Sequence, residues 1–215
     1  MKTFKFANSE IYLHDNDLPA DLNIGNKVGI DTETTGLSLF RDRLCLVQVA
    51  IAPKVCHMVR FDENPGRIED ISPNLLKLLN NNEIQKIYHY ARFDVAMLKK
   101  FCGVLTQNNF CTKIASKLVR TYTDKHGLKD LCKELLDIDL NKSQQSSDWS
   151  SRNLSDSQIK YAANDVIFLF DIKNKLESML EREKRQELAS EIFKFIPTRV
   201  KLDLLDWKEV DIFSH

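Results

Sequence analysis

The sequence has no long apolar run. Hydrophobic residues make up 43% of its 215 residues, but no uninterrupted stretch approaches the roughly 20 apolar residues that a membrane span needs. The first residues, Met-Lys-Thr-Phe-Lys-Phe, lack the apolar core and the small-residue cleavage site of a secretion signal. We therefore expect a soluble, cytoplasmic protein.

Closely spaced cysteines are also missing. A zinc site or a disulfide framework usually shows paired cysteines, often as Cys-x-x-Cys. The five cysteines are odd in number and far apart, which favours reduced and mostly buried thiols. They are Cys45, Cys56, Cys102, Cys111 and Cys132.

Neither sign of charge is in excess. The chain has 31 basic and 31 acidic residues, whereas proteins that hold long nucleic acid without sequence preference usually carry a basic face. Neutrality argues mildly for a short or small ligand, and a local basic patch stays open.

What the sequence does contain is an apolar run that ends in two carboxylates, at residues 27–37. In a strand, successive side chains alternate between the two faces, so Asp31 and Glu33 would share one face. Paired carboxylates repel each other unless one is protonated or a cation lies between them. Hard oxygen ligands of this kind select Mg²⁺ or Mn²⁺. The alternative at this point is an acidic strand end before a solvent-exposed turn.

The remaining pattern predicts an α/β domain. Strands come first, and the chain from residue 111 onward reads as almost entirely helical. We find no repeat, low-complexity tract or linker, which favours one domain with a C-terminal extension. We expect an edge strand within residues 4–14, an antiparallel hairpin of residues 43–51 and 55–61, a short strand at 86–90, and helices over 73–82, from 92 and from 155.

Two later segments add acidic residues to the pair. Asp94 follows a short strand, and Asp165 lies on a late helix with Tyr161 four residues before it, so that these two side chains occupy one helix face. Each has an ordinary alternative: Asp94 as a helix cap, Asp165 as a solvated residue and Tyr161 as a core residue. Their joint occurrence in this order makes chance agreement improbable.

The sequence resembles the DEDD superfamily of 3′-5′ exonucleases, in the subclass whose third motif carries tyrosine. The matching segments are residues 29–37, 89–94 and 161–165. Lys160 stands where the histidine subclass has its histidine. The resemblance implies an α/β ribonuclease H-like mixed sheet flanked by helices, with an exonuclease domain over residues 1–195 and a helical extension over 196–215.

Residues 127–131 and 142–149 resemble ribonuclease D, but the chain is most similar to the compact nanoRNase C family. That resemblance implies a 3′-5′ exoribonuclease that hydrolyses very short RNA, dinucleotides above all, and forms a homo-octamer. The alternatives are ribonuclease D-like trimming of structured RNA 3′ ends, a DNA 3′-5′ exonuclease, and a non-catalytic nucleic-acid-binding module.

The motifs assign roles to individual residues. We expect Asp31, Glu33, Asp94 and Asp165 to hold two divalent ions, Mg²⁺ or Mn²⁺, and Tyr161 to orient the attacking water. The predicted substrate-binding residues are Thr34, Gly36, Leu37, His89, Arg92, Gln145, Ser146 and Trp149.

The end of the chain is rich in apolar side chains. Leu204, Leu205, Trp207 and Phe213 form a candidate contact with a neighbouring subunit. Packing of this segment onto its own domain is equally compatible with the sequence.

Overall fold

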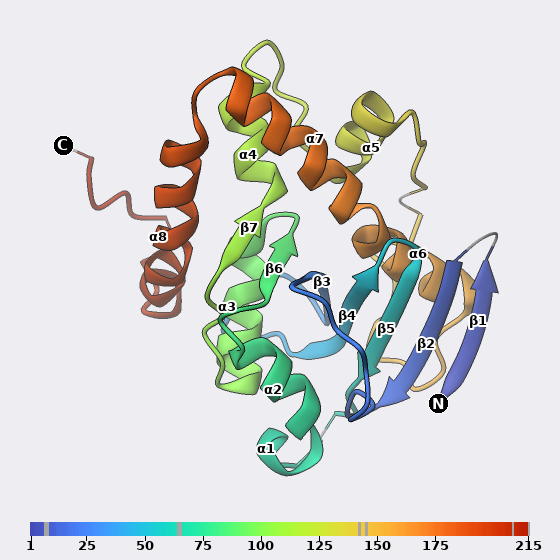
Figure 1. Cartoon of the computed structure of the whole chain (residues 1–215). Helices are drawn as coiled ribbons and strands as arrows, with labels where there is room; N and C mark the ends of the chain where they lie inside the picture. The colour runs from blue at the N-terminus through green and yellow to red at the C-terminus, as the bar shows by residue number, and fades with distance from the viewer. Residues whose placement is uncertain (7–8, 64–65, 142, 145, 208, 215) are drawn as a thin grey trace.

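The chain folds into one mixed sheet with helices on both faces (Figure 1). The structure is a computed structural model that describes residues 1–6, 9–63, 66–141, 143–144, 146–207 and 209–214. Within these residues the sheet has seven strands in the order β1-β2-β5-β4-β3-β6-β7. They are β1 (Lys2–Phe6), β2 (Ser9–Asp15), β3 (Lys27–Thr34), β4 (Leu44–Ala52), β5 (Val55–Arg60), β6 (Gln85–Tyr88) and β7 (Asn109–Cys111).

Both strand directions occur in the sheet. The pairs β1/β2, β3/β4 and β4/β5 are antiparallel, whereas β2/β5, β3/β6 and β6/β7 are parallel. The β4–β5 hairpin, the α/β class and the mixed sheet of the sequence prediction are confirmed.

Two strand predictions need correction. The strand expected at one edge, β2, lies inside the sheet between β1 and β5, because the first residues form a further strand, β1, that covers it. The segment from residue 111 was expected to be helical at its start, but Cys111 ends the three-residue strand β7. A strand this short carries too little alternation to be recognised in sequence.

Helices cover both faces of the sheet. One apolar cluster packs α4 to α7 on one face, and a second packs α1 to α3 and much of α8 on the other. The helices are α1 (Ile68–Ile71), α2 (Pro73–Asn80), α3 (Ala91–Cys102), α4 (Thr112–Val119), α5 (Leu128–Leu136), α6 (Asp156–Ile167), α7 (Leu169–Arg182) and α8 (Gln186–Leu204).

The last helix crosses the predicted domain boundary without a break. α8 contains Pro197 and continues to Leu204, with Ile196 and Val200 buried in the core. After it, the chain leaves the body of the protein as a tail, the red segment ending at C in Figure 1. Phe213 in this tail is 79% exposed. The first part of the predicted extension therefore packs on its own domain, and the subunit contact of the rest stays a prediction.

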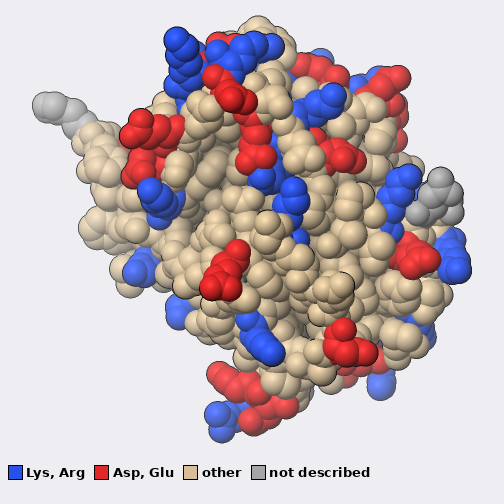
Figure 2. Space-filling model, viewed as in Figure 1, with Lys and Arg blue, Asp and Glu red and all other residues tan. Residues whose placement is uncertain are grey.

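The surface shows no separation of charge on the face of Figure 2. Among the side chains coloured there, lysine and arginine are interspersed with aspartate and glutamate.

The five cysteines are buried and free. Among the described residues we find no helix that combines the length and the apolar character required to cross a bilayer.

Candidate active site

Three carboxylates meet where β3 faces α6. Asp31 and Glu33 are two residues apart on β3 and project from the same face, while Asp165 comes from α6, which packs on that face. Ligand oxygens of the three residues lie within 4.8 Å of one another. The strand alternation that the sequence predicted therefore produces the paired carboxylates.

Gly29 permits the close approach of α6 to β3. A Cβ atom at this position would lie 2.9 Å from the backbone oxygen of Val166, the residue after Asp165. Such a contact is too short for any larger residue unless the helix moves. The missing side chain therefore contributes to the short distance between the carboxylates on the two elements.

The start of α6 is fixed by a capping box. The Ser155 hydroxyl accepts a hydrogen bond from the Gln158 backbone N–H at 3.3 Å, and the Gln158 side chain accepts one from the Ser155 backbone N–H at 2.9 Å. These bonds satisfy two amide groups that would otherwise lack partners. The register they set places Tyr161 and Asp165 one turn apart on the side that faces β3.

Asp94 approaches the same site from the first turn of α3. Its side chain is 3% exposed, and its Oδ1 accepts a hydrogen bond from the Thr32 hydroxyl at 2.7 Å. Tyr90, directly before the helix, has a left-handed backbone with φ of 72°, a conformation that is uncommon outside glycine. Asp94 lines the same cavity as the other three carboxylates but lies outside their tight group.

Burial and mutual repulsion raise the pKa values of these carboxyl groups. Burial, followed by the charge of Asp94, raises the pKa of Asp31 well above its usual range. Burial, followed by Asp165, does the same for the pKa of Glu33. Burial also raises the pKa of Asp94 to about 7, against the opposing effect of the Thr32 hydrogen bond. The site therefore favours either protonation or a bound cation.

Tyr161 stands beside these carboxylates as a protonated phenol. Burial first, and then the charges of Asp165 and Glu33, raise its pKa far above the usual range. A phenol with a raised pKa donates a hydrogen bond and is a poor base. Its ring lies 6.0 Å from that of Trp149, which is 4% exposed.

Gln48 is a site residue that the sequence did not reveal. It is buried on β4 opposite Asp31, and its Nε2 donates to Asp31 Oδ2 at 3.3 Å and to Glu33 Oε1 at 3.4 Å. Only the strand pairing brings it there. The amide therefore holds the two carboxylates of β3 in a fixed relation to each other.

The donor set fits a hard divalent cation. Three carboxylates whose oxygens lie within 4.8 Å of one another offer the ligand type that Mg²⁺ and Mn²⁺ prefer. The raised pKa values point the same way, because a cation between the groups removes their repulsion.

The carboxylates lie in a cavity of about 690 Å³. At its rim the turn after β3 is organised by Asp42, whose Oδ2 accepts the Ser38 backbone N–H at 2.8 Å. A Cβ atom on Gly36 would lie 2.4 Å from this oxygen, so a larger residue would have to displace the Asp42 carboxylate from Ser38. The turn presents Leu37, which is 83% exposed, beside the cavity. Of the predicted substrate-binding residues, the cavity is lined by Thr34, Gly36, Leu37, His89, Ser146 and Trp149.

The other two predicted substrate residues have different positions. The Arg92 side chain forms an ion pair with Asp203 of α8, and Arg92 is not among the residues that line the cavity. Gln145 lies outside the described residues. Contacts of either residue with substrate stay predictions.

Lys113 and Tyr90 also line the cavity, and sequence reasoning did not single them out. The Lys113 ammonium lies 4.3 Å from the centre of the Tyr90 ring, a cation–π contact. Lys113 is the one lysine or arginine among the described cavity-lining residues. Lys113 lies in the first turn of α4, directly after β7. Because this three-residue strand was not recognised in the sequence, the position of Lys113 beside the cavity was not predicted.

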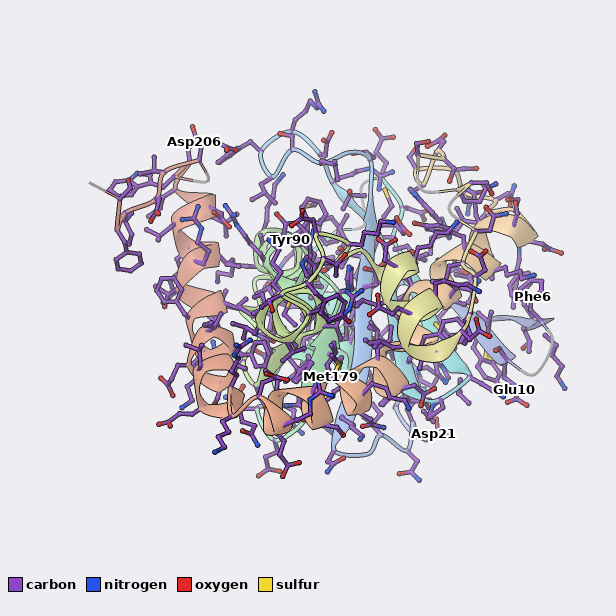
Figure 3. The ribbon with its side chains drawn as sticks, turned by 90° about the horizontal axis from the view of Figure 1, so that it is seen from above. Phe6, Glu10, Asp21, Tyr90, Met179 and Asp206 are labelled. Atoms are coloured by element: carbon purple, nitrogen blue, oxygen red, sulfur yellow. The ribbon has the colours of Figure 1, made fainter. Side chains whose placement is uncertain are left out.

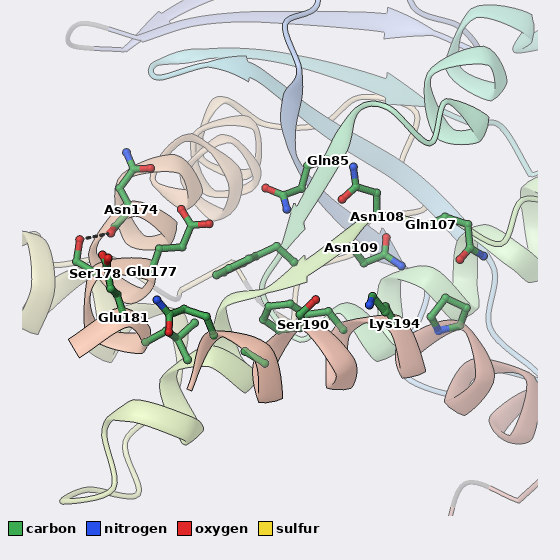
Figure 4. A pocket seen from close by; sticks show the side chains of 16 residues that line it. Gln85, Gln107, Asn108, Asn109, Asn174, Glu177, Ser178, Glu181, Ser190 and Lys194 are labelled. Atoms are coloured by element: carbon green, nitrogen blue, oxygen red, sulfur yellow. Dashed lines mark hydrogen bonds between the residues drawn. The ribbon is translucent and has the colours of Figure 1, made fainter. Parts of the chain in front are cut away.

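A larger cavity of about 810 Å³ lies elsewhere (Figure 4). It is bordered by α7, α8 and the beginnings of β6 and β7, and its lining combines carboxamide, hydroxyl and charged side chains with the rings of Phe110 and Phe193. None of the predicted site residues that the structure describes lines it.

Comparison with known proteins identifies related sequences. The model of a 3′-5′ exonuclease family matches residues 14–181. DNA polymerase I of Aquifex aeolicus is 37% identical over 162 residues, 74% of this chain and 25% of that protein. Ribonuclease D of Gluconacetobacter diazotrophicus is 36% identical over 166 residues, 77% of this chain and 41% of that protein. The chain thus spans less than half the length of these relatives.

A solved structure matches almost the whole chain. NrnC of Brucella melitensis is 48% identical with a TM-score of 0.89, over 95% of this chain and 98% of that one. Other structures of the same protein are described as bound to pGG and with bound Mg²⁺. The predicted resemblance to ribonuclease D-like and nanoRNase C enzymes is confirmed.

Proposed function

The chain belongs to the family of 3′-5′ exonucleases, and we propose that it is a metal-dependent exoribonuclease for very short RNA, preferentially dinucleotides. The products are nucleoside 5′-monophosphates. The observation that carries the proposal is the group of Asp31, Glu33 and Asp165 oxygens within 4.8 Å, with Asp94 in the same cavity.

Two divalent ions held by these four carboxylates would supply a hydroxide near neutral pH and stabilise charge on the leaving oxygen. The protein's own groups have separate tasks. Tyr161, kept protonated by burial, donates a hydrogen bond that orients the attacking water. Gln48 donates hydrogen bonds to Asp31 and Glu33 and so fixes the positions of the two carboxylates relative to each other.

Features of the cavity rim support a preference for short substrates. Lys113 is suited to bind a phosphate, Tyr90 offers a ring for a base, and Leu37 projects beside the cavity to wedge between bases. A dinucleotide carries its 5′ phosphate within reach of one such cation, whereas a longer chain places further nucleotides there. The pGG described with NrnC is a ligand of this kind.

The exposed tail supports assembly of several copies, for which the nanoRNase C resemblance implies an octamer. Large apolar side chains in water favour contact with another protein surface. The exposed apolar side chains after α8 are Leu205, Trp207, Val210, Ile212 and Phe213.

A cytoplasmic location is also proposed and agrees with the free cysteines.

A length series tests the proposed substrate. Purified protein is incubated with Mg²⁺ and 5′-labelled RNAs of two to about twenty nucleotides, and with DNA of the same sequences, under conditions where kcat/KM is compared. We expect kcat/KM to fall steeply beyond the dinucleotide. Equal rates on long or base-paired RNA would support ribonuclease D-like trimming instead, and faster hydrolysis of DNA would support a DNA exonuclease.

A catalytic control separates hydrolysis by this site from contamination. Asp31→Ala and Asp165→Ala each remove one ligand and are expected to abolish hydrolysis while leaving the fold intact, because loss of a carboxylate relieves repulsion. Hydrolysis at the wild-type rate by both variants would refute the proposed site. Light scattering of the wild-type protein measures the number of subunits.

A further inference from the structure

A buried carboxylate outside the cavity lining connects two arginines. Asp203, near the end of α8, is 1% exposed. Arg92 Nε donates to its Oδ2 at 2.6 Å, and Arg92 Nη2 donates to its Oδ1 at 2.7 Å. Arg199 Nη2 lies 3.0 Å from the same Oδ1.

The first of these arginines stands two residues before a metal-ligand candidate. Arg92 and Asp94 both lie in the first turn of α3, and residues two apart point to nearly opposite sides of a helix. Arg92 therefore holds one side of this turn to α8, while Asp94 on the other side faces Thr32 and the cavity. Figure 3 labels Tyr90, the residue directly before α3, and Asp206, two residues after the end of α8.

The second arginine connects the same carboxylate to the tail. Arg199 Nη2 donates to the Trp207 carbonyl at 2.9 Å, and its Nη1 donates to the Val210 carbonyl at 3.1 Å. One carboxylate thus links the start of α3, the end of α8 and the chain that follows.

The arrangement specifies position more than it adds stability. Apolar residues such as Val200 already bury the contact between α8 and the body of the protein, and a buried ion pair contributes little net stability because both charges lose their hydration. A bidentate arginine–carboxylate contact, however, fixes the distance and orientation between the two side chains and thus between α3 and α8. The position of α3 matters because Asp94 is the one predicted ligand outside the tight group of three.

We propose that Asp203 is a positioning residue that sets the place of Asp94 through Arg92. This inference rests on the proposed metal-dependent function. Removal of a group bonded directly to a metal ligand typically changes metal affinity or activity by about 10- to 100-fold. Asp203 acts through one further residue, so we expect an effect at the lower end of this range.

The test uses Asp203→Asn in the full chain, because asparagine keeps the shape and removes the charge. We expect Mn²⁺ binding, measured by titration calorimetry without substrate, to weaken about tenfold or more, with a similar fall in kcat. We expect KM for the dinucleotide to stay within about twofold, since Asp203 does not line the cavity.

Two further variants keep the test decisive. Val200→Ala removes apolar packing from the same helix and is expected to lower the melting temperature while preserving Mn²⁺ affinity. Arg92→Lys keeps the charge but loses the bidentate contact, and is expected to weaken Mn²⁺ binding as Asp203→Asn does. If Asp203→Asn does not fold, Arg92→Lys replaces it as the test of the positioning role.

The outcomes separate this proposal from the function on which it rests. Unchanged Mn²⁺ affinity in Asp203→Asn or Arg92→Lys, or an equal loss in Val200→Ala, would overturn the positioning role. If the wild-type protein binds Mn²⁺ but hydrolyses no oligonucleotide, the proposed function fails. The positioning role still stands in that case if Asp203→Asn weakens binding.

Discussion

Replacing Asp94 by asparagine should stabilise the metal-free protein at alkaline pH. Burial raises the pKa of Asp94 to about 7 in the folded state, against about 3.8 as the ordinary value. Between these two values the folded protein binds more protons at this site than the unfolded chain, so its stability falls as pH rises. The amide of asparagine does not ionise, and its oxygen still accepts the hydrogen bond from Thr32.

The size of the effect follows from the difference in pKa. A difference of about 3 units corresponds to about 4 kcal/mol once both states are ionised, at about 1.4 kcal/mol per unit. Part of this loss is already present at pH 5, since the unfolded carboxyl is ionised there. The stability advantage of Asp94→Asn over the wild type should therefore grow by about 2 to 3 kcal/mol between pH 5 and pH 8.

Urea denaturation with a chelator at a series of pH values measures this difference. Asp171→Asn removes a carboxyl from the exposed side of α7 and controls for the loss of one negative charge. Adding Mg²⁺ at pH 8 should stabilise the wild type more than Asp94→Asn, because the wild type retains the additional ligand. An advantage that does not grow with pH, or that Asp171→Asn reproduces, would refute the reasoning.

Three other substitutions probe the site. Gly29→Ala places a Cβ against the Val166 carbonyl, which should lower the free energy of unfolding by about 1–3 kcal/mol. If α6 moves by about 1 Å as a result, kcat should fall by up to about 10²-fold. A wild-type kcat would show that the helix does not move. Tyr161→Phe should keep Mn²⁺ affinity in calorimetry but slow hydrolysis by about 10²-fold, and an unchanged rate would exclude the orienting role of its hydroxyl. Lys113→Met should raise KM about tenfold or more for a 5′-phosphorylated dinucleotide and leave KM for the unphosphorylated one nearly unchanged; equal increases would place Lys113 elsewhere on the substrate.

Local patterns were sufficient for the elements that carry the predicted catalytic residues. The alternation of β3 predicted that Asp31 and Glu33 share a face, and a helix was predicted to begin at residue 155, where the structure shows the capping box of Ser155 and Gln158. These features depend on neighbours within a few residues, so sequence contains the whole physical cause.

Features that depend on contacts between distant segments were not predictable in this way. Gln48 reaches the carboxylates only through the pairing of β3 with β4, and Gly29 matters only because α6 crosses it. The partner of Arg92 is 111 residues away on α8. In each case the deciding neighbour is set by tertiary packing, which periodicity along the chain does not encode.

Arg199 donates hydrogen bonds to two carbonyls of the tail. If copies assemble through the tail, we expect assembly and cation binding to affect each other's affinity. If a second copy grips the tail, and Asp203 transmits its position to Asp94, both binding events share one coupling free energy. A chelator would then loosen the oligomer by the same factor by which oligomerisation tightens the hold on the cation. Dilution of the protein would thus weaken cation binding, and removal of the ions would weaken assembly.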